Sequence, residues 1–299
     1  MHELTNLAQL ILSGILIGAI YGLVATGFVV TYRTVQVFNI AYGEFAVLGA
    51  FIAWTLIGSP GEPRLPLPLA IVLAIVAAVI LGLLVERLFF RRLLGKPVYV
   101  AFIASLGLMS VLYGITMLVW GPGTRVFART LPTGPVHLGG VVLGREFIWS
   151  SLIAVIVVLG FWLFLRKTKM GLGMRASYDN QVAARCLGVS ARLNSQIAWA
   201  MCAVIATTGG ILTASVAGVD SSLSNVVMVV LVVALVGGMD SIVGAMLGGL
   251  ILAIGTNLVS FYLNPIVPGV DTVFSMVLIL FVLLVRPSGL LGVKPIERV

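Results

Sequence analysis

Long apolar runs with almost no charge constrain this chain more than any other feature of its sequence. Nine can be drawn, and of the 18 basic and 10 acidic residues only Glu44 and Asp271 fall inside them. Most runs reach the roughly 20 residues that a helix needs to cross about 30 Å of hydrocarbon. With 60% hydrophobic and 9% charged residues, the chain lacks the polar surface of a water-soluble fold. The segments are 7–32, 38–57, 67–85, 98–120, 147–165, 197–219, 225–239, 242–263 and 270–285.

These segments are predicted to be helices, because lipid offers no partner for free backbone N–H and C=O groups. The sequence also lacks the short alternating strands that are typical of a membrane β-barrel. We therefore predict an all-α integral membrane protein, a polytopic bundle of eight or nine transmembrane helices that forms a single domain over residues 1–299. Segment 225–239 is the weak member, since about 15 helical residues cover only about 22 Å.

Basic residues sort unevenly between the two sets of loops. The larger set predicts a cytoplasmic C-terminus and an N-terminus outside, by the positive-inside rule. Segment 225–239 is then needed as a span to bring the basic tail back to the cytoplasm. This sorting accounts for the net charge of +8, so no nucleic-acid partner is expected. The larger set is Arg33, Arg87, Arg91, Arg92, Lys96, Arg166, Lys167, Lys169, Arg175, Arg185, Arg192, Arg286, Lys294 and Arg298, and the smaller set is Arg64, Arg125, Arg129 and Arg145.

Glycines recur every four residues in two of the segments. Gly14, Gly18 and Gly22 share one face of the first segment, and Gly244 and Gly248 do so in a later one. Helices in lipid gain by close van der Waals contact, so these stripes predict helix–helix seams. A wall of a pore is the alternative interpretation.

The sequence gives no sign of catalysis. It has no G-x-x-x-x-G-K-[ST] phosphate loop, and its two histidines, His2 and His137, stand in no zinc-binding pattern. Cys186 and Cys202 are expected to be unpaired. We therefore predict no catalytic residue, no metal site and no cofactor in this chain, which has no recognisable means of hydrolysing ATP by itself.

Glu44 is the one acidic residue placed deep in a predicted span. A carboxylate at such depth usually faces the interior of the bundle or a cavity. Three roles remain open: a hydrogen-bond anchor between helices, a gate or pathway residue, and a proton relay in an ion-coupled carrier.

The segment 166–195 is too long for a simple connection between two spans. Residues 175–188 are predicted to form a short helix that ends at Gly188. Either a partner docks there, with Ala183 and Ala184 allowing close approach and Arg185 donating to an acidic patch, or the helix lies on lipid headgroups.

Several blocks together resemble the permeases of branched-chain amino-acid ABC importers. The sequence F-N-I-A-Y-G-E at 38–44 is similar to the N-F-A-H-G-E segment of that family, and A-A-x-x-x-G at 183–188 is similar to its ATPase-docking loop. The other matching blocks are 85–87, 169–171, Arg192, 237–249 and 286–292. The blocks run in the order of the family over nearly the whole chain, and they resemble the first of the two permease types.

The resemblance implies a working assembly and a set of functional residues. A second related permease, two cytoplasmic ATPase subunits and a soluble extracytoplasmic binding protein would accompany this chain in the cytoplasmic membrane of a bacterium or archaeon. Segment 166–195 would be the cytoplasmic loop that docks on the ATPase. The implied coupling residues are Ala183, Ala184, Arg185 and Gly188, and the implied pathway or gate residues are Asn39, Tyr42, Gly43, Glu44, Gly237, Gly238, Asp240 and Ser241.

Departures from the family pattern bear on the cargo. Tyr42 stands where the family has histidine, Asp240 where it has glycine, Arg33 where it has glycine and Thr256 where it has an acid. Asp240 and Ser241 are also predicted to cap the helix that follows. Branched-chain or related amino acids are the first expectation for the cargo. Urea, short amides or another small carboxylic or aromatic nutrient remain open, as do an ion-coupled carrier and a scaffolding membrane protein.

Overall fold

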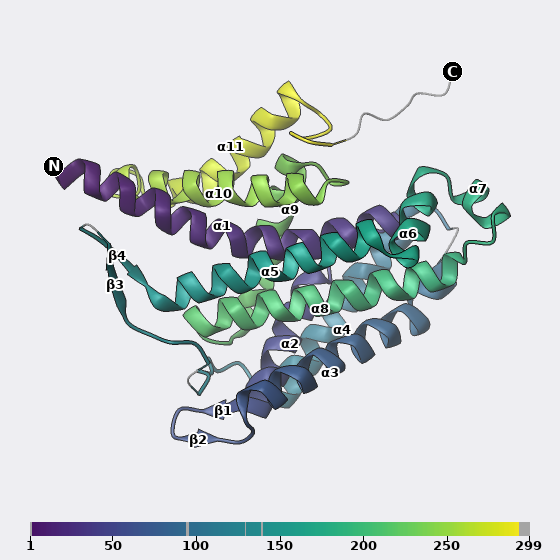
Figure 1. Cartoon of the computed structure of the whole chain (residues 1–299), viewed down its shortest axis with the longest axis horizontal. Coiled ribbons are helices and arrows are strands. Elements are labelled where there is room, and N and C mark those ends of the chain that lie inside the picture. The colour runs from purple at the N-terminus through teal and green to yellow at the C-terminus, as the bar shows by residue number, and fades with distance from the viewer. Residues whose placement is uncertain (1, 94–95, 129, 139, 293–299) are drawn as a thin grey trace. The chain divides into compact units, whose positions relative to one another are not determined.

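The structure is a computed structural model that describes residues 2–93, 96–128, 130–138 and 140–292. Arg129, Lys294 and Arg298, which belong to the basic sets above, lie outside the described residues. Helices dominate, with two short hairpins between them (Figure 1). The elements are α1 (His2–Val35), α2 (Tyr42–Ile57), β1 (Gly58–Ser59), β2 (Glu62–Pro63), α3 (Leu67–Leu88), η1 (Phe90–Leu93), α4 (Val98–Trp120), β3 (Pro135–Leu138), β4 (Val141–Gly144), α5 (Arg145–Lys167), α6 (Lys169–Asp179), α7 (Gln181–Cys186), α8 (Ala191–Ala217), η2 (Ser221–Asn225), α9 (Val226–Gly237), α10 (Ile242–Tyr262) and α11 (Val270–Val285).

Each predicted apolar segment coincides with a helix. Six of the described helices are long and apolar enough to cross a membrane by length and composition: α1, α3, α4, α5, α8 and α10. Three shorter apolar helices complete the set, namely α2, α11 and the stretch from η2 through α9. The prediction of an all-α polytopic membrane protein is therefore confirmed. The number of crossings and the sidedness of the two termini remain predictions.

The chain divides into two compact units. Unit 1 comprises residues 1–29, 131–155 and 228–299, and unit 2 comprises residues 30–130 and 156–227. Unit 1 thus contains most of α1, the β3–β4 hairpin, and α9, α10 and α11. Unit 2 contains α2, α3, α4, the α6–α7 loop and α8.

In unit 1, the glycine stripe of α1 packs against α10. A Cβ atom added at Gly14 or at Gly18 would lie 2.8 Å from the Cα atom of Ile254 or of Leu250, respectively, and one at Gly22 would lie 3.0 Å from Met246 Cα. Real Cβ atoms essentially never approach a backbone to 2.8 Å, so Gly14 and Gly18 require glycine, and the contact at Gly22 is also tight. The predicted helix–helix seam is confirmed.

The second glycine stripe joins α10 to α9 within the same unit. Gly244 lies against the backbone of Gly237, and a Cβ atom at Gly248 would lie 2.5 Å from the carbonyl oxygen of Val233. The helix α11 packs on α10, where the ring of Phe274 covers Gly255. The helix α10 therefore contacts α1, α9 and α11, and both glycine stripes are packing surfaces.

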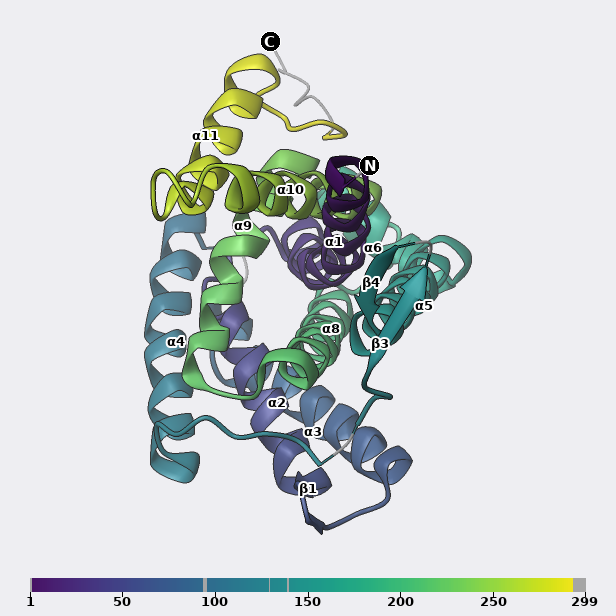
Figure 2. The same ribbon diagram turned by 90° about the vertical axis from the view of Figure 1, so that its left-hand side faces the viewer.

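In unit 2, the short helix α2 is a core helix. It contacts α3, α4, α8 and η2 (Figure 2), and 12 of its 16 residues are buried, which leaves little of its surface for lipid. Gly210 of α8 lies directly on the backbone of Ala46. The contact of α3 with α8 is also close, since a Cβ atom at Gly82 would lie 2.5 Å from the carbonyl oxygen of Trp199.

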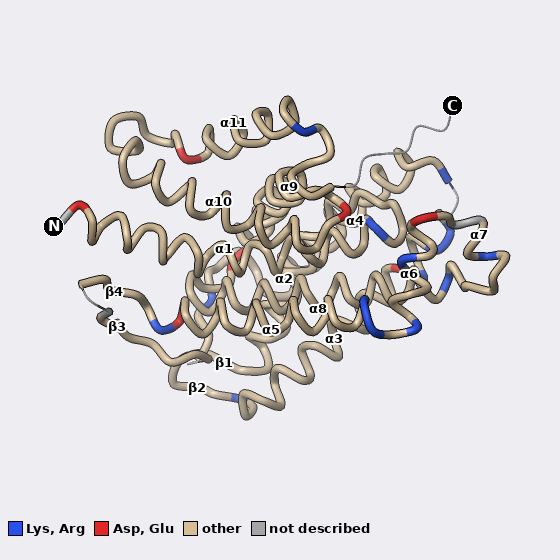
Figure 3. The backbone as a smooth tube through the Cα atoms, turned by 45° about the horizontal axis from the view of Figure 1, so that its top comes forward, with Lys and Arg blue, Asp and Glu red and all other residues tan. Residues whose placement is uncertain are grey.

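The two ends of unit 2 differ in charge. Most of its Lys and Arg residues gather around α6, α7 and the end of α3, and few lie near the β1–β2 hairpin at the opposite end (Figure 3). The sorting by loops that the sequence predicts is therefore a sorting by the ends of this unit. We call the first the basic end and the second the hairpin end.

Candidate functional site

The loop between α5 and α8 folds into two helices instead of the single helix predicted over 175–188. Thr168 begins α6, where its side chain accepts a hydrogen bond of 3.0 Å from the backbone N–H of Gly171. Asn180 then separates α6 from α7 because its backbone is extended, with φ −157° and ψ 102°. Its side-chain oxygen accepts from Ala183 N at 3.0 Å, so Asn180 ends one helix and begins the next.

The helix α7 ends at a glycine, as predicted. Gly188 has φ +84°, and the backbone N–H of Val189 donates to the carbonyl oxygen of Ala184 at 2.9 Å. A positive φ favours glycine because other residues meet a steric cost there. Ala183, Arg185 and Gly188 are exposed, whereas Ala184 is buried against its own loop. The helix α7 therefore exposes a small side chain at Ala183 and a basic one at Arg185.

Side-chain contacts from α6 fasten the loop to α8 and to α1 in unit 2. The side chain of Asn194 in α8 donates a buried hydrogen bond of 2.8 Å to the hydroxyl of Ser177 in α6. The guanidinium carbon of Arg33 lies 4.9 Å from the centroid of the Tyr178 ring. A displacement of α6 and α7 would therefore pull on the first turn of α8 and on the end of α1.

Trp199 of α8 connects this region to α2 and α3. Its side chain is fully buried, and its ring stacks on Phe90 at a centroid distance of 4.2 Å. The ring of Phe45 in α2 lies 6.1 Å away by the same measure. The backbone of Trp199 also contacts Gly82. Trp199, which follows the first turns of α8, therefore contacts α2, α3 and η1.

The residues predicted at the start of α2 are brought together and buried. Asn39, Tyr42 and Glu44 are each at most 1% exposed. Gly43 lies against the carbonyl oxygen of Ser224, where no larger residue would fit. This cluster is built within unit 2, close to Phe45 and so to Trp199.

Two carboxyl groups lie buried in unit 2 without a hydrogen-bond partner. Both side-chain oxygens of Glu44 and both of Glu86 are inaccessible and unpaired among the described residues. Glu86 follows the small residues Ala74, Ala78 and Gly82 at the same four-residue spacing on the buried face of α3. An unpaired carboxylate away from water is costly, so each of these groups is a candidate for a functional role.

The residues predicted at 237–241 lie in unit 1 and are occupied in packing and capping. The hydroxyl of Ser241 accepts from Gly244 N at 3.0 Å and caps α10, so this cap is confirmed for Ser241. Gly238, with φ +111°, lies against Gly289 and Gly292 of the C-terminal segment.

The C-terminal segment 286–292 in turn completes the end of α9. Leu290 N donates to Val236 O at 2.9 Å and Leu291 N donates to Gly237 O at 3.0 Å. These carbonyl groups have no partner within α9, because a helix leaves its last carbonyls free. Gly237 and Gly238 thus provide the backbone surface on which this segment sits.

Comparison with known proteins identifies the family of this chain. A family profile described as the permease component of the branched-chain amino acid transport system matches residues 10–285. The chain belongs to this family.

The sequence of this permease is similar to those of known permeases over most or all of its length. It is 27% identical to the high-affinity branched-chain amino acid transport system permease protein BraD of Pseudomonas aeruginosa, over 100% of both chains. It is 28% identical to the corresponding permease LivH of Escherichia coli, over 97% of both chains. The ribose import permease RbsC of Escherichia coli is 28% identical over 78% of this chain and 74% of its own. The chain is thus a permease component of a transport system, as its family and its relatives are described.

Sequence reasoning missed three parts of this permease. It did not single out Trp199, and it predicted neither the β1–β2 and β3–β4 hairpins nor the backbone pairing of segment 286–292 with α9. The small residues Ala70, Ala74, Ala78 and Gly82 were a usable signal for the α3–α8 contact. No local pattern marks the pairing of 286–292 with α9, because its partners lie about 50 residues apart in the chain.

Proposed function

We propose that this chain is half of the membrane tunnel of an ATP-driven importer for branched-chain or related amino acids. The membership of the family and the full-length similarity to BraD and LivH support this cargo. The similarity to a ribose import permease is the reason to keep the cargo open to other small polar nutrients, including urea and short amides. The membrane would be the cytoplasmic membrane of a bacterium or archaeon.

The proposed assembly contains a second related permease, two cytoplasmic ATPase subunits that bind ATP, and a soluble extracytoplasmic binding protein. In this assembly, α7 is the element that docks on an ATPase subunit, with Ala183, Arg185 and Gly188 on its exposed side. The observation that carries this proposal is the construction of the loop. The small exposed helix α7 at the basic end follows directly on α6, and α6 is tied to α8 by the Asn194–Ser177 hydrogen bond.

The proposed mechanism follows from the contacts inside unit 2. When the ATPase subunits close on ATP, they displace α7, and the fastened loop moves the first turn of α8 with it. Trp199 passes this movement to α2 and α3 through Phe45, Phe90 and Gly82. The start of α2, with Asn39, Tyr42, Gly43 and Glu44, then shifts as the proposed gate. The residues Gly237, Gly238, Asp240 and Ser241 keep a second proposed gate role in unit 1.

The sidedness of the chain can be tested with its own two cysteines. Cys186 in α7 is exposed and Cys202 in α8 is buried. A membrane-impermeant maleimide added to intact cells should leave the chain unlabelled, and it should label Cys186 after the membrane is permeabilised. A Cys186→Ser variant should then take up no label, because Cys202 is out of reach. Labelling of Cys186 in intact cells would place the basic end outside and refute the proposal.

The composition of the assembly can be tested by co-purification. The tagged chain, solubilised in mild detergent, should retain a second permease and an ATPase that carries a phosphate-loop sequence, as identified by mass spectrometry. Arg185→Glu should reduce the recovered ATPase, while Arg145→Glu, an exposed arginine far from α7 in the sequence, should not. A chain that purifies alone under conditions that preserve its transport activity would contradict the proposal.

A second candidate function, an ion-coupled carrier, rests on the buried carboxyl group of Glu44. Intramembrane carboxyl groups serve as proton or cation relays in some carriers. The importer uses ATP and the carrier uses an ion gradient, so uptake measured with each energy source distinguishes the two functions.

A further inference from the structure

At the hairpin end of unit 2, two arginines stack on one tryptophan. The guanidinium carbon of Arg125 lies 5.3 Å from the centroid of the Trp54 ring, and that of Arg64 lies 5.9 Å from it. Both arginines are exposed, and Trp54 is half-buried. The face of the indole ring carries a negative electrostatic potential that attracts cations. Contact with it therefore restricts the orientation of the planar guanidinium groups. We call Arg64, Trp54 and Arg125 the stacked-arginine surface.

Backbone carbonyl groups fix these side chains further. Arg64 Nη1 donates to Thr55 O at 3.1 Å, and Arg125 Nη2 donates to Trp120 O at 3.2 Å. A guanidinium group has five N–H donors, so most of the donors on each arginine remain available to an acceptor from outside. The arrangement is that of two preorganised forks, which match the geometry of carboxylate groups.

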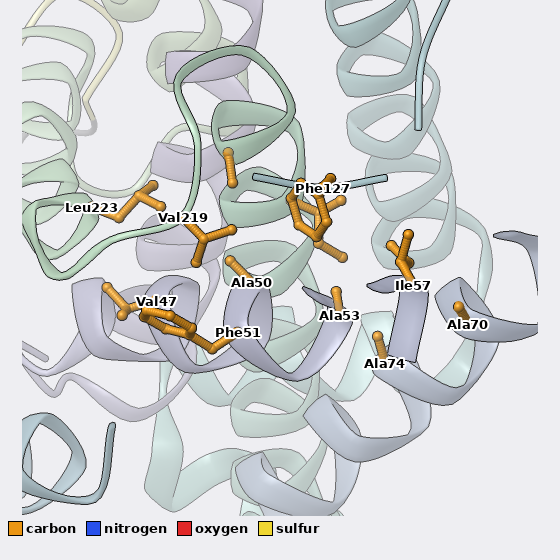
Figure 4. Close-up of a cluster of buried hydrophobic side chains, with 12 residues drawn as sticks. Val47, Ala50, Phe51, Ala53, Ile57, Ala70, Ala74, Phe127, Val219 and Leu223 are labelled. Carbon is orange, nitrogen blue, oxygen red and sulfur yellow. The ribbon is translucent and has the colours of Figure 1, made fainter. Parts of the chain in front are cut away.

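The segment 124–128 that carries Arg125 is pinned along its length. Arg125 and Val219 exchange two backbone hydrogen bonds of 2.7 Å each, and Trp54 Nε1 donates to Val126 O at 3.1 Å. Phe127 enters the apolar cluster that contains Ala53 and Ile57 (Figure 4). Val126 faces the other way and is 59% exposed. The segment is thus a rigid strap with an outward surface.

The surface also carries acidic groups of its own. The carboxylate of Asp220 accepts hydrogen bonds from Ser222 and Thr124, and Glu62 is exposed in the β1–β2 hairpin. Among the described residues, neither acid forms an ion pair with Arg64 or Arg125. Positive and negative groups therefore alternate over a short distance. Such a pattern suits a protein surface of complementary charges, and it suits a uniformly anionic bilayer poorly.

We propose that the stacked-arginine surface is the docking site for acidic side chains of the soluble binding protein. This inference rests on the proposed function and assigns its extracytoplasmic contact to named residues. Aspartate or glutamate side chains of the binding protein accept from the free N–H donors of Arg64 and Arg125, and its basic groups approach Glu62. Trp54 and the backbone carbonyl groups of Thr55 and Trp120 already hold both guanidinium groups. Docking therefore orders little of the permease, and less binding free energy is lost to that ordering.

The test uses intact cells that produce the complete importer. A photo-crosslinking amino acid at Val126 should form an adduct with a soluble extracytoplasmic protein on irradiation, and mass spectrometry identifies that protein. The adduct should weaken steadily as salt is raised, because exposed charge pairs are screened beyond about 10 Å at 0.1 M salt. The combined change Arg64→Glu and Arg125→Glu should reduce both the adduct and substrate uptake by at least about tenfold. The control Arg145→Glu should alter neither.

The results separate this inference from the proposed function. If the unaltered importer shows no ATP-driven uptake, the proposed function fails. If uptake is normal and survives the double charge reversal, or if the label at Val126 reacts only with lipid, only the docking site is refuted. The salt dependence of the adduct in the chain without charge reversal decides the question even if the double variant does not reach the membrane, since a salt-independent adduct would also refute the docking site.

Discussion

The helix α7 and the strap 124–128 lie at opposite ends of unit 2, and both present an exposed arginine. They are held in different ways. The strap is bonded along its length to α2, β1 and Val219 in the loop after α8, and Phe127 anchors it in the core. The helix α7 is held by a cap at Asn180, a turn at Gly188 and one buried alanine. The strap is thus fastened at several points, whereas α7 has few attachments, as our proposal requires of the element that the ATPase displaces.

The change with the largest expected effect removes the link between these two ends. Trp199→Ala leaves a cavity in a fully buried site and should lower stability by about 3–5 kcal/mol. In the fraction that folds, uptake per ATP hydrolysed should fall at least about tenfold, since α7 no longer moves α2. Trp199→Phe keeps an aromatic ring and should retain most coupling. Purified complex in proteoliposomes gives both rates, and equal loss of uptake and hydrolysis would favour a purely structural role.

The turn at Gly188 tests the freedom of α7 directly. Gly188→Val forces a branched residue into φ +84°, and nothing lies within 4 Å to clash with it, so the damage is confined to the turn. Uptake should fall at least about fivefold, while the amount of chain in the membrane stays unchanged.

Gly269 is the matched control for this turn. It has the same φ of +84° and the same open surroundings, but it lies between α10 and α11. Gly269→Val should carry the same backbone strain and leave uptake close to normal. Similar losses in both variants would show that strain alone, and not the position in α7, determines the result.

Glu44 distinguishes a gate from a relay. The ATP-driven mechanism needs the shape of this side chain more than its charge, so Glu44→Gln should change uptake by less than about threefold. Removal of a buried unpaired carboxyl group should also leave the thermal stability equal or higher. An ion-coupled relay would lose uptake almost entirely in this variant. Initial rates of uptake at saturating ATP measure the difference.

The smallest effects are expected when one arginine at each end of unit 2 is replaced by lysine. Arg91, at the basic end after α3, is expected to act through its charge alone, so Arg91→Lys should leave uptake unchanged within error. Arg64→Lys keeps the charge but loses the planar fork and most of the stacking on Trp54. Uptake at limiting substrate should therefore fall about two- to fivefold in Arg64→Lys only. Equal behaviour of the two variants would remove the distinction between the ends.

The helices of this permease follow from its sequence because lipid allows only helices or closed barrels, and the sequence lacks the alternating strands of a barrel. The short segment 225–239 was predicted as a span from the sorting of basic residues, and it forms α9. The seam through Gly14, Gly18 and Gly22 could also be predicted, because only close helix packing rewards glycine at that spacing.

The candidate site was less predictable, because it depends on contacts between distant residues. Nothing near Trp199 in the sequence indicates that Phe45 and Phe90 will meet its ring. The backbone pairing of Arg125 with Val219 joins two loops that each look irregular alone. Residues 237–241 were singled out by resemblance as a gate, and the structure gives them packing and capping contacts that local sequence does not reveal, except for the cap at Ser241.

Uptake into proteoliposomes tests the central claim most directly. Vesicles that contain this chain alone, and vesicles that contain the chain with its second permease, ATPase subunits and binding protein, are compared with radiolabelled leucine under a proton or sodium gradient and with ATP. Our account predicts accumulation only in the complete assembly with ATP, and none by the chain alone under either gradient. Accumulation of leucine by the chain alone, driven by an ion gradient, would contradict the account.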